Sequence, residues 1–262
     1  MTVISNRLKL EHDHLQLLVD QGRVRLATLQ EARAAGDRTE EKKSGAIEVR
    51  ILEKQLESYD QTLQKVRQGI ELMIPIAPSI NRRLAAIHYH YENWLEVIEK
   101  GTYAATLSVR LGGDGYINAV KYNAEVIAFL QNTHALCDSL PYVLNLYLRA
   151  FELDSRNIGW RKGKLQKLRD TAVAKGEAEL ARHLDLFAEN ARFLKLQDIV
   201  NCSKHKHLVP MFLRNGKVFF ANLDGSWKPS DIDVHEFMVG VDNELVDQVE
   251  KMLRLAASHP MA

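Results

Sequence analysis

Residues 198–207 carry a dense cluster of polar and titratable side chains, in the order Asp-Ile-Val-Asn-Cys-Ser-Lys-His-Lys-His. On a helix, Asp198 lies three residues before Asn201 and His205 lies four residues after it, so these three side chains would share one face. Lys204 adds a cation beside the imidazole. Such a pair can hold a phosphate and transfer a proton. Asn201, Lys204 and His205 are therefore candidate catalytic residues.

The segment Asn201-Cys202-Ser203-Lys204-His205 resembles the signature of the HEPN superfamily, which comprises compact helical bundles of toxin–antitoxin, phage-defence and RNA-processing proteins. The family motif places an Arg, often followed by Asn, four to six residues before a His on a late helix. Asn201 and His205 match the Asn and His positions, whereas Val200 occupies the Arg position. The resemblance covers residues 79–207 and implies a homodimer that cleaves RNA without a metal. Lys204 would replace the missing Arg, although an ammonium cannot make the forked contact of a guanidinium.

Two other pairs bear on this resemblance. Arg83 and His88 repeat the Arg-to-His spacing, but on an early helix where the motif is not expected, so we interpret them as a coincidence. His134 and Asp138 lie one helical turn apart, and a carboxylate at that spacing orients an imidazole and raises its basicity. In HEPN-like bundles a polar residue of an earlier helix often faces the motif, which makes His134 and Asp138 further catalytic candidates. Alternatively, His134 is a core histidine and Asp138 is only its hydrogen-bond partner.

The sequence gives no basis for a metal ion or another cofactor. His88 and His90 would splay apart on a helix, and neither Cys-X-X-Cys nor His-Glu-X-X-His spacing occurs. The glycine-rich segment 112–115 lacks the Lys-Ser/Thr of a phosphate-binding loop, and the Gly-X-Ser-X-Gly of a serine nucleophile is absent. We therefore expect neither a metal nor a cofactor.

A basic stretch with an embedded tryptophan, Trp160, follows the middle of the chain. A basic helix face beside an aromatic ring would suit phosphate contacts and base stacking. The alternative is an ordinary solvated helix surface. The candidate nucleic-acid-binding residues are Arg156, Arg161, Lys162, Lys164 and Lys167.

Composition favours long helices to position these residues. The 262 residues include only 14 Gly and 6 Pro, and turns between strands need both. The formal charge of +1 provides no global field for nucleic acid or membranes. The N-terminus lacks the apolar stretch of a secretory signal, and no apolar run reaches the about 20 residues of a membrane span. With Cys137 and Cys202 expected to be buried thiols, we predict a cytoplasmic protein without membrane contact.

Apolar spacing predicts a helical hairpin over residues 1–74. One stripe alternates steps of three and four residues from Val49 to Met73, and a less regular stripe runs from Leu8 to Leu29. The polar connector 34–45 lies between them and predicts an antiparallel pair, although one continuous, dimerising coiled coil would also fit. The prolines Pro75 and Pro78 are expected to end the second helix.

Further elements follow from similar patterns. Ser79 is a predicted N-cap for a helix to Lys100, residues 117–151 form a central helix that Pro141 kinks, and one amphipathic helix leads from Gly176 into the polar cluster. Asn215-Gly216 between two apolar runs predicts a β-hairpin over 209–222. A closing helix spans 242–257, and residues 232–241 fit either a helix or a strand.

Together these patterns predict an all-α fold, an antiparallel helical bundle with a long N-terminal helical hairpin and a small β-hairpin near the C-terminus. The expected parts are the hairpin 1–74, a HEPN-like bundle 79–207, and the segment 208–262 packed on it. The predicted function is binding of RNA or a nucleotide by a homodimer, with metal-independent ribonuclease activity. The alternative is a non-catalytic interaction or oligomerisation module built on the hairpin. A third hypothesis is a regulator with a ligand pocket beside His134.

Overall fold

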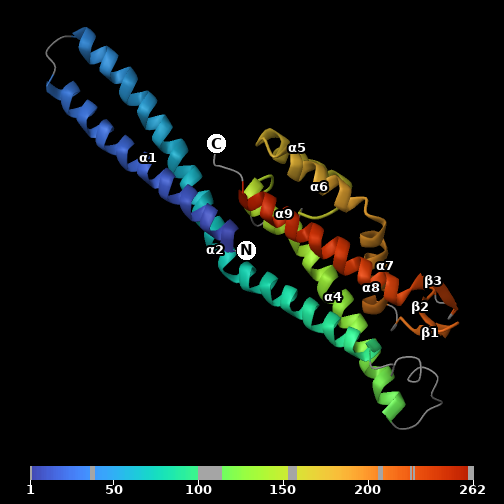
Figure 1. Cartoon of the computed structure of the whole chain (residues 1–262). Helices are drawn as coiled ribbons and strands as arrows, with labels where there is room; N and C mark the ends of the chain where they lie inside the picture. Colours follow the sequence, from blue (N-terminus) through green and yellow to red (C-terminus); the bar gives the residue numbers. More distant parts are fainter. Residues whose placement is uncertain are drawn as a thin grey trace. The chain divides into compact units, whose positions relative to one another are not determined.

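The structure, a computed structural model, describes residues 2–35, 39–99, 114–152, 158–205, 209–224, 226 and 228–258. It is mostly helical, with a small three-stranded antiparallel sheet near the C-terminus (Figure 1). Contacts divide the chain into two compact units, and the boundary lies between Ile76 and Ala77. Residues 112 and 113 of the glycine-rich segment 112–115 lie outside the described residues, as does Lys100, the predicted end of the helix that starts at Ser79.

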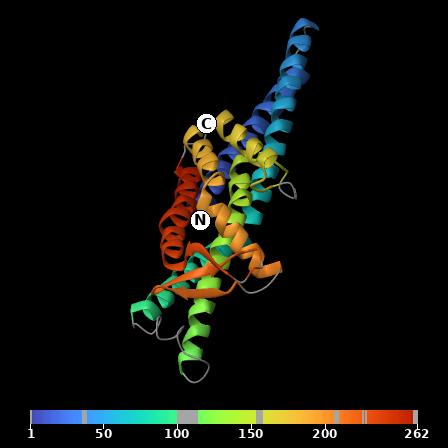
Figure 2. The ribbon, with the colours of Figure 1, turned by 90° about the vertical axis from the view of Figure 1, so that its right-hand side faces the viewer.

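The first unit is an antiparallel hairpin of α1 (Thr2–Ala35) and the first part of α2 (Thr39–Glu99), which run side by side in Figures 1 and 2. An ion pair of 3.2 Å joins Arg23 Nη2 on α1 to Asp60 Oδ1 on α2. A Cβ on Gly22 would lie 2.6 Å from Leu56 Cδ2, so this glycine lets the leucine approach the α1 backbone. The chain therefore folds back, as the hairpin hypothesis predicts and the continuous coiled coil does not.

The prediction that Pro75 and Pro78 end the second helix is wrong, because α2 continues through both prolines to Glu99. Each proline removes the N–H that would bond the carbonyl four residues earlier, on Glu71 and Ile74. Both of those residues are exposed, so water can solvate the carbonyls instead. Ser79 consequently lies inside a helix and is not an N-cap.

The second unit contains the rest of α2 and all later elements. Its helices pack around aromatic and aliphatic side chains that are almost fully buried, among them Trp94, Phe129, Phe187, Phe193 and Phe220. These later elements are α4 (Asp114–Leu148), α5 (Lys162–Ala174), α6 (Ala178–Ala188), α7 (Ala191–His205), β1 (Met211–Arg214), β2 (Lys217–Ala221), β3 (Pro229–Asp233), α8 (Val234–Gly240), η1 (Val241–Val246) and α9 (Asp247–Ser258).

Helix α4 is the predicted central helix, and it contains Pro141 without ending there. Because Pro141 has no N–H, the carbonyl of Cys137 has no helical donor. The indole N–H of Trp160 donates to that carbonyl at 2.9 Å. Residues on nearly every side of α4 between Phe129 and Leu148 are buried, which explains its apolar sequence.

The sheet has the order β1-β2-β3, with both pairings antiparallel. Asn215 and Gly216 connect β1 to β2 with φ values of 55° and 75°, the pattern of a type I′ turn, which confirms the predicted hairpin. The segment 232–241, for which the sequence fits either a helix or a strand, contains the end of β3 at Ile232 and Asp233 and is helical from Val234 onward. The sheet lies at the end of α7 and contacts α8 (Figures 1 and 2).

The amphipathic segment after Gly176 is two helices, α6 and α7, and not the single helix predicted. The break occurs at Asn190, whose Oδ1 accepts hydrogen bonds from the backbone N–H of Arg192 at 2.8 Å and of Phe193 at 3.2 Å. This is the role of an N-cap, which a short amide side chain fills well. Helix α7 therefore begins afresh at Ala191 and carries the polar cluster.

The predicted closing helix begins earlier than expected, at Val234, where the Asp233 side chain accepts from the backbone N–H of Glu236 at 3.0 Å. Residues Val241–Val246 form a π-helical turn between α8 and α9. Within the described part of the chain, no helix combines the length and apolar character needed to span a bilayer.

Candidate functional site

Helix α7 directs its polar side chains toward two different places. Asp198 and Asn201 line a groove of about 660 Å³ that lies between α7 and the sheet. Lys204 instead lies on the side of α4, where its charge acts on His134. The two helices pack together there, and Gln131 Nε2 donates to Ser203 Oγ at 3.4 Å. The structure thus joins Asp198 to Asn201, as predicted, but places Lys204 apart from them.

The first groove, called here the α7–sheet groove, combines a cation, a carboxylate, two amides and a hydroxyl. On α7, Lys195, Asp198 and Asn201 follow one another at three-residue spacing, which keeps them on one face. We find no hydrogen bond or ion pair for these three side chains within the described part of the chain. Its lining residues are Lys195, Asp198, Asn201, Cys202, Ala221, Asn222, Leu223, Ser230 and Ile232.

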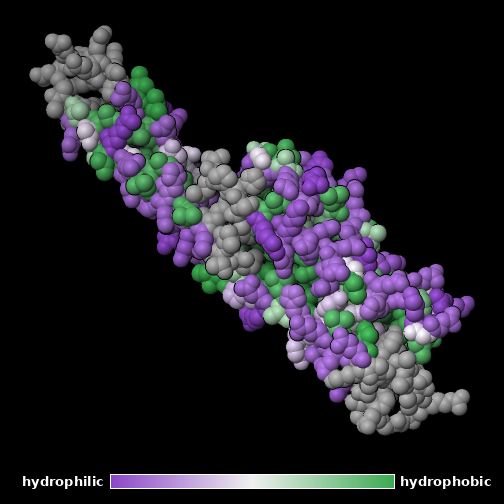
Figure 3. Space-filling model, viewed as in Figure 1, coloured by the Kyte–Doolittle hydropathy of each residue, from purple (hydrophilic) through white to green (hydrophobic). Residues whose placement is uncertain are grey.

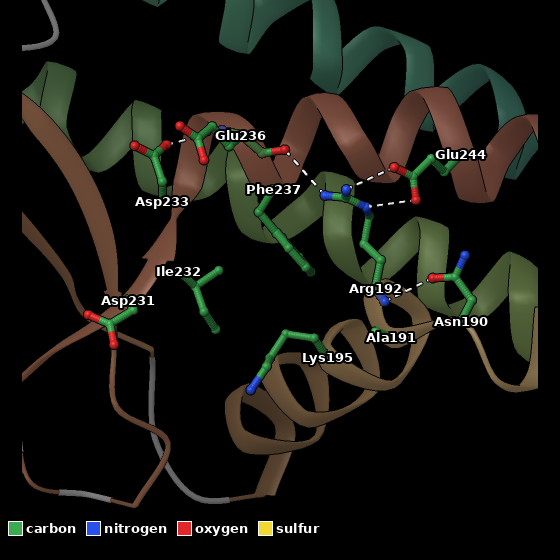
Figure 4. A pocket seen from close by; sticks show the side chains of 10 residues that line it. All are labelled: Asn190, Ala191, Arg192, Lys195, Asp231, Ile232, Asp233, Glu236, Phe237 and Glu244. Atoms are coloured by element: carbon green, nitrogen blue, oxygen red, sulfur yellow. Dashed lines mark hydrogen bonds and ion pairs between the residues drawn. The ribbon is translucent and has the colours of Figure 1, made fainter.

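A second groove of about 560 Å³, the α7–α8 groove, adjoins the first and shares Lys195 and Ile232 with it (Figure 4). Phe237 and Ile232 point into this groove and give it an apolar floor. The residues that line it are Asn190, Ala191, Arg192, Lys195, Asp231, Ile232, Asp233, Glu236, Phe237 and Glu244.

Arg192 is held firmly at the side of the α7–α8 groove. Its Nε and Nη2 donate to the two carboxylate oxygens of Glu244 at 3.1 and 2.8 Å, and Nη1 donates to the backbone carbonyl of Glu236 at 3.4 Å. A Cβ on Gly240 would lie 2.0 Å from Nη1, so only glycine lets the guanidinium rest there. Every nitrogen of the guanidinium therefore already has an acceptor.

The other carboxylates of the α7–α8 groove also have cationic partners. Lys217 Nζ lies 2.9 Å from Glu236 Oε1 and 3.5 Å from Asp233 Oδ2, and the hydrogen bond with Glu236 is the main reason that the pKa of Lys217 is raised. Asp231 is 3.8 Å from Arg214. Among the described residues lining the two grooves, Lys195 is thus the cation that remains unpaired.

His134 and Asp138 form the predicted pair, with 3.2 Å between Nδ1 and Oδ2. The ring is only 4% exposed, and its Nδ1 makes no properly aligned hydrogen bond within the described structure. Burial lowers the pKa of His134, the charge of Asp138 opposes this and the charge of Lys204 reinforces it. His134 is therefore a neutral core imidazole near pH 7, and neither His134 nor Asp138 lines either groove.

The remaining predicted residues are distributed as follows. The backbone of His205 ends α7, but its side chain lies outside the described residues, as does Arg156. Arg161 and Lys162 are exposed at the start of α5, Lys164 is partly buried, and Lys167 Nζ lies 4.6 Å from the centre of the Phe151 ring.

Trp160 does not present a free face for base stacking. Its ring lies 4.8 Å from Phe187 and 5.6 Å from Phe193, between centroids, and its N–H is bonded to the Cys137 carbonyl. The basic stretch beside it therefore exposes cations at Arg161 and Lys162 but lacks the stacking platform that the sequence suggested. This tryptophan is partly buried and packs against the core.

The described residues contain no group of three or more His, Cys, Asp or Glu side chains that could hold a metal ion. Cys137 is unsuited to act as a nucleophile, because burial and the nearby Asp138 charge raise the pKa of its thiol. The chemistry that the grooves offer is hydrogen bonding and a single uncommitted ammonium. Such groups are chemically suited to an anionic, polar ligand.

Sequence reasoning missed several groove residues. Lys195 could have been found, because it extends the spacing of Asp198 and Asn201 by one further turn of α7. Asn222 and Ser230 carry no comparable signal, since only the sheet brings β2 and β3 to α7. Arg192 and Glu244 are 52 residues apart, and their pairing likewise depends on tertiary packing.

In comparisons with known proteins, the chain matches no protein-family profile, no curated protein and no solved structure.

Proposed function

We propose that this protein binds a nucleotide or a short single-stranded RNA segment in the α7–sheet groove. The observation that supports this function is the set of three side chains, Lys195, Asp198 and Asn201, which face one groove and have no partner within the described residues. Exposed polar groups that converge on a concave surface are the usual signature of a ligand site.

Each group suits a different part of a nucleotide. The ammonium of Lys195 attracts a phosphate as a point charge. The amides of Asn201 and Asn222 each offer a donor and an acceptor, as the edge of a nucleobase requires. The carboxylate of Asp198 accepts hydrogen bonds from ribose hydroxyls. A groove of about 660 Å³ falls within the range of small-molecule sites.

Binding is tested by titrating the four ribonucleoside monophosphates and a fluorescent single-stranded RNA against the purified protein. Lys195→Gln is expected to weaken binding by about tenfold or more, since a charged hydrogen bond is lost. The matched control is Lys54→Gln, on the exposed face of the hairpin, which should bind like the wild type. Equal affinities of the two variants, or no binding by the wild type, would reject the α7–sheet groove as a nucleotide site.

RNA cleavage without a metal, which the HEPN resemblance implies, is part of the same proposal and is tested separately. The buried His134 cannot reach a phosphodiester in this conformation, so of the two imidazoles predicted to be catalytic, His205 is the one left for acid–base chemistry. Total RNA incubated with the protein in EDTA should be cleaved by the wild type and not by His205→Ala. Intact RNA in both samples would leave a binding protein without nuclease activity.

One observation favours the alternative function of an interaction module. Leu10, Leu17 and Val24 recur every seventh residue of α1 and are 61%, 53% and 69% exposed. Figure 3 shows hydrophobic patches over the surface of the hairpin. A seven-residue repeat of apolar side chains is the pattern by which one helix packs along another. Light scattering on the full chain with Leu10, Leu17 and Val24 all changed to Ser would detect a loss of mass if this stripe mediates self-association.

A further inference from the structure

We infer that the ligand is a dinucleotide unit, with its bridging phosphate on Lys195 and one nucleoside in each of the two grooves. The inference rests on the proposed function and deepens it. The geometry that points to it is the junction of the grooves: Lys195 and Ile232 line both, so a group bound at Lys195 has a compartment on either side. A mononucleotide would fill one compartment and leave the other empty.

We place the phosphate at the junction because Lys195, the cation there, has no ion-pair partner within the described chain. Arg192 also lines the α7–α8 groove, but its guanidinium nitrogens already donate to Glu244 and to the Glu236 carbonyl. Recruiting it for a phosphate would break a bidentate ion pair. Lys195 has no such partner within the described chain, so a phosphate gains a charged contact there without loss of another.

The α7–α8 groove fits an uncharged planar group better than a second phosphate. Four carboxylates line it, those of Asp231, Asp233, Glu236 and Glu244, and they already engage the cations of Arg192, Arg214 and Lys217, so apart from Lys195 no cation among the described residues is free there for a second phosphate. The same oxygens can accept hydrogen bonds from the amino groups of a base. Phe237 and Ile232 supply apolar surface, and a volume of about 560 Å³ leaves room for a nucleoside.

Arg192 provides the surface on which such a base would stack. Glu244 fixes its guanidinium plane along one edge, and the side chain remains 29% exposed. Nucleobases stack on guanidinium planes as they do on aromatic rings. A guanidinium that is already immobilised loses little further freedom on stacking, so the platform is preorganised.

The acidic rim also limits the length of the ligand. Asp231 is fully exposed and Glu236 is 70% exposed at the α7–α8 groove, and each is paired with a cation, Arg214 and Lys217. A chain that continued past the stacked base would bring its next phosphate to these carboxylates, where it could gain a cation only by breaking an ion pair. The grooves therefore select a free dinucleotide or the last two nucleotides of an RNA over an internal segment. Both sources share one chemistry, two nucleosides joined by one phosphodiester.

The test compares ligands on the unmodified protein by calorimetry. The four homodinucleoside monophosphates, the matching nucleoside monophosphates, a linear ten-nucleotide RNA and its circularised form are titrated in turn. At least one dinucleoside monophosphate should bind about tenfold more tightly than its mononucleotide, since stacking of a second base supplies that factor. The linear RNA should bind more tightly than the circle, which has no end. A linear RNA no better than the circle would restrict the site to free dinucleotides.

Two variants locate the second nucleoside. Arg192→Ala should reduce dinucleotide affinity toward that of the mononucleotide while mononucleotide binding is retained, and Lys195→Gln should weaken both. If mononucleotides bind as tightly as dinucleotides to the wild type, the two-groove inference is wrong and nucleotide binding stands. If no ligand binds, the proposed function fails with it.

Discussion

The indole N–H of Trp160 replaces the backbone donor that Pro141 removes from α4, because it bonds the carbonyl of Cys137 at 2.9 Å. Trp160→Phe keeps most of the aromatic packing but leaves that buried carbonyl without a donor. We expect a loss of about 1–2 kcal/mol in the free energy of unfolding, as for other buried unsatisfied groups. Urea denaturation followed by circular dichroism measures it.

A double-mutant cycle with Pro141→Ala separates the hydrogen bond from the packing. Alanine at position 141 restores the N–H, so the carbonyl of Cys137 regains a helical partner. The cost of Trp160→Phe should therefore be smaller in the Pro141→Ala background than in the wild type. Equal costs in both backgrounds would show that the indole matters only through its contacts with Phe187 and Phe193.

Gly240 and Arg192 should be energetically coupled. Gly240→Ala places a Cβ where the guanidinium rests, so the side chain must leave Glu244. Both Gly240→Ala and Arg192→Ala are expected to cost about 1 kcal/mol, the scale of a partly exposed ion pair. In the Arg192→Ala background, Gly240→Ala should cost nothing or stabilise the helix. Thermal denaturation of the four proteins tests this, and additive losses would contradict it.

His134 should make the fold sensitive to acid. Burial lowers its pKa below the unfolded value of 6.5, so the unfolded chain binds a proton more readily. Stability is therefore complete above pH 6.5 and falls as the pH drops below it. His134→Leu should flatten the dependence of unfolding free energy on pH between 7 and 5. His183, whose pKa burial also lowers, should leave a residual slope.

Asp138, which lies beside His134, provides a control in which the dependence of the unfolding free energy on pH should become steeper instead of flatter. The charge of Asp138 raises the pKa of His134 and partly offsets burial. Asp138→Asn removes that effect, lowers the pKa further and should steepen the acid loss. An unchanged profile in both variants would mean that other groups cause the acid sensitivity.

Gly22 should be required for the hairpin. Alanine favours helix by about 1 kcal/mol over glycine, but its Cβ would overlap Leu56, and overpacking costs about 1–3 kcal/mol. Gly22→Ala should therefore destabilise the hairpin, whereas Gly22→Ala with Leu56→Ala should be no less stable than Leu56→Ala alone. Chemical denaturation compares the variants. A stabilising effect of the single change would show that Leu56 moves aside freely.

Local signals in the sequence predicted the elements that depend on short-range chemistry. Asn215-Gly216 predicted a hairpin because both residues tolerate positive φ, and Asn215 and Gly216 adopt it. The apolar stripe of α2 predicted its buried residues Val49, Leu56, Val66 and Met73. By contrast, whether Pro75 and Pro78 end the helix depended on whether the carbonyls of Glu71 and Ile74, which lose their N–H donors, are accessible to water. That accessibility depends on the fold.

The candidate site was only partly predictable, because helical spacing is a local property whereas the neighbours of each side chain depend on the tertiary fold. Asp198 and Asn201 share a groove because helical spacing alone fixes their face. Lys204 follows Asn201 at the same three-residue spacing, yet it lies beside α4, because each such step falls about 60° short of a full helical turn and three steps place Lys204 opposite Lys195. The indole of Trp160 seemed suited to nucleic acid but packs against the core aromatic residues Phe187 and Phe193, because a basic sequence context does not indicate burial.

The π-helical turn of Val241–Val246 has a consequence for how this chain can vary. A turn that bonds residue i to i+5 holds one residue more than an α-helix needs, as if an insertion had been absorbed locally. Deleting one residue there would restore ordinary helix and keep the buried face of α9 in register, whereas the same deletion within α9 would rotate all later side chains by about 100°. Shortened homologues should therefore lose their residue in this turn, and with it the placement of Glu244 that holds Arg192.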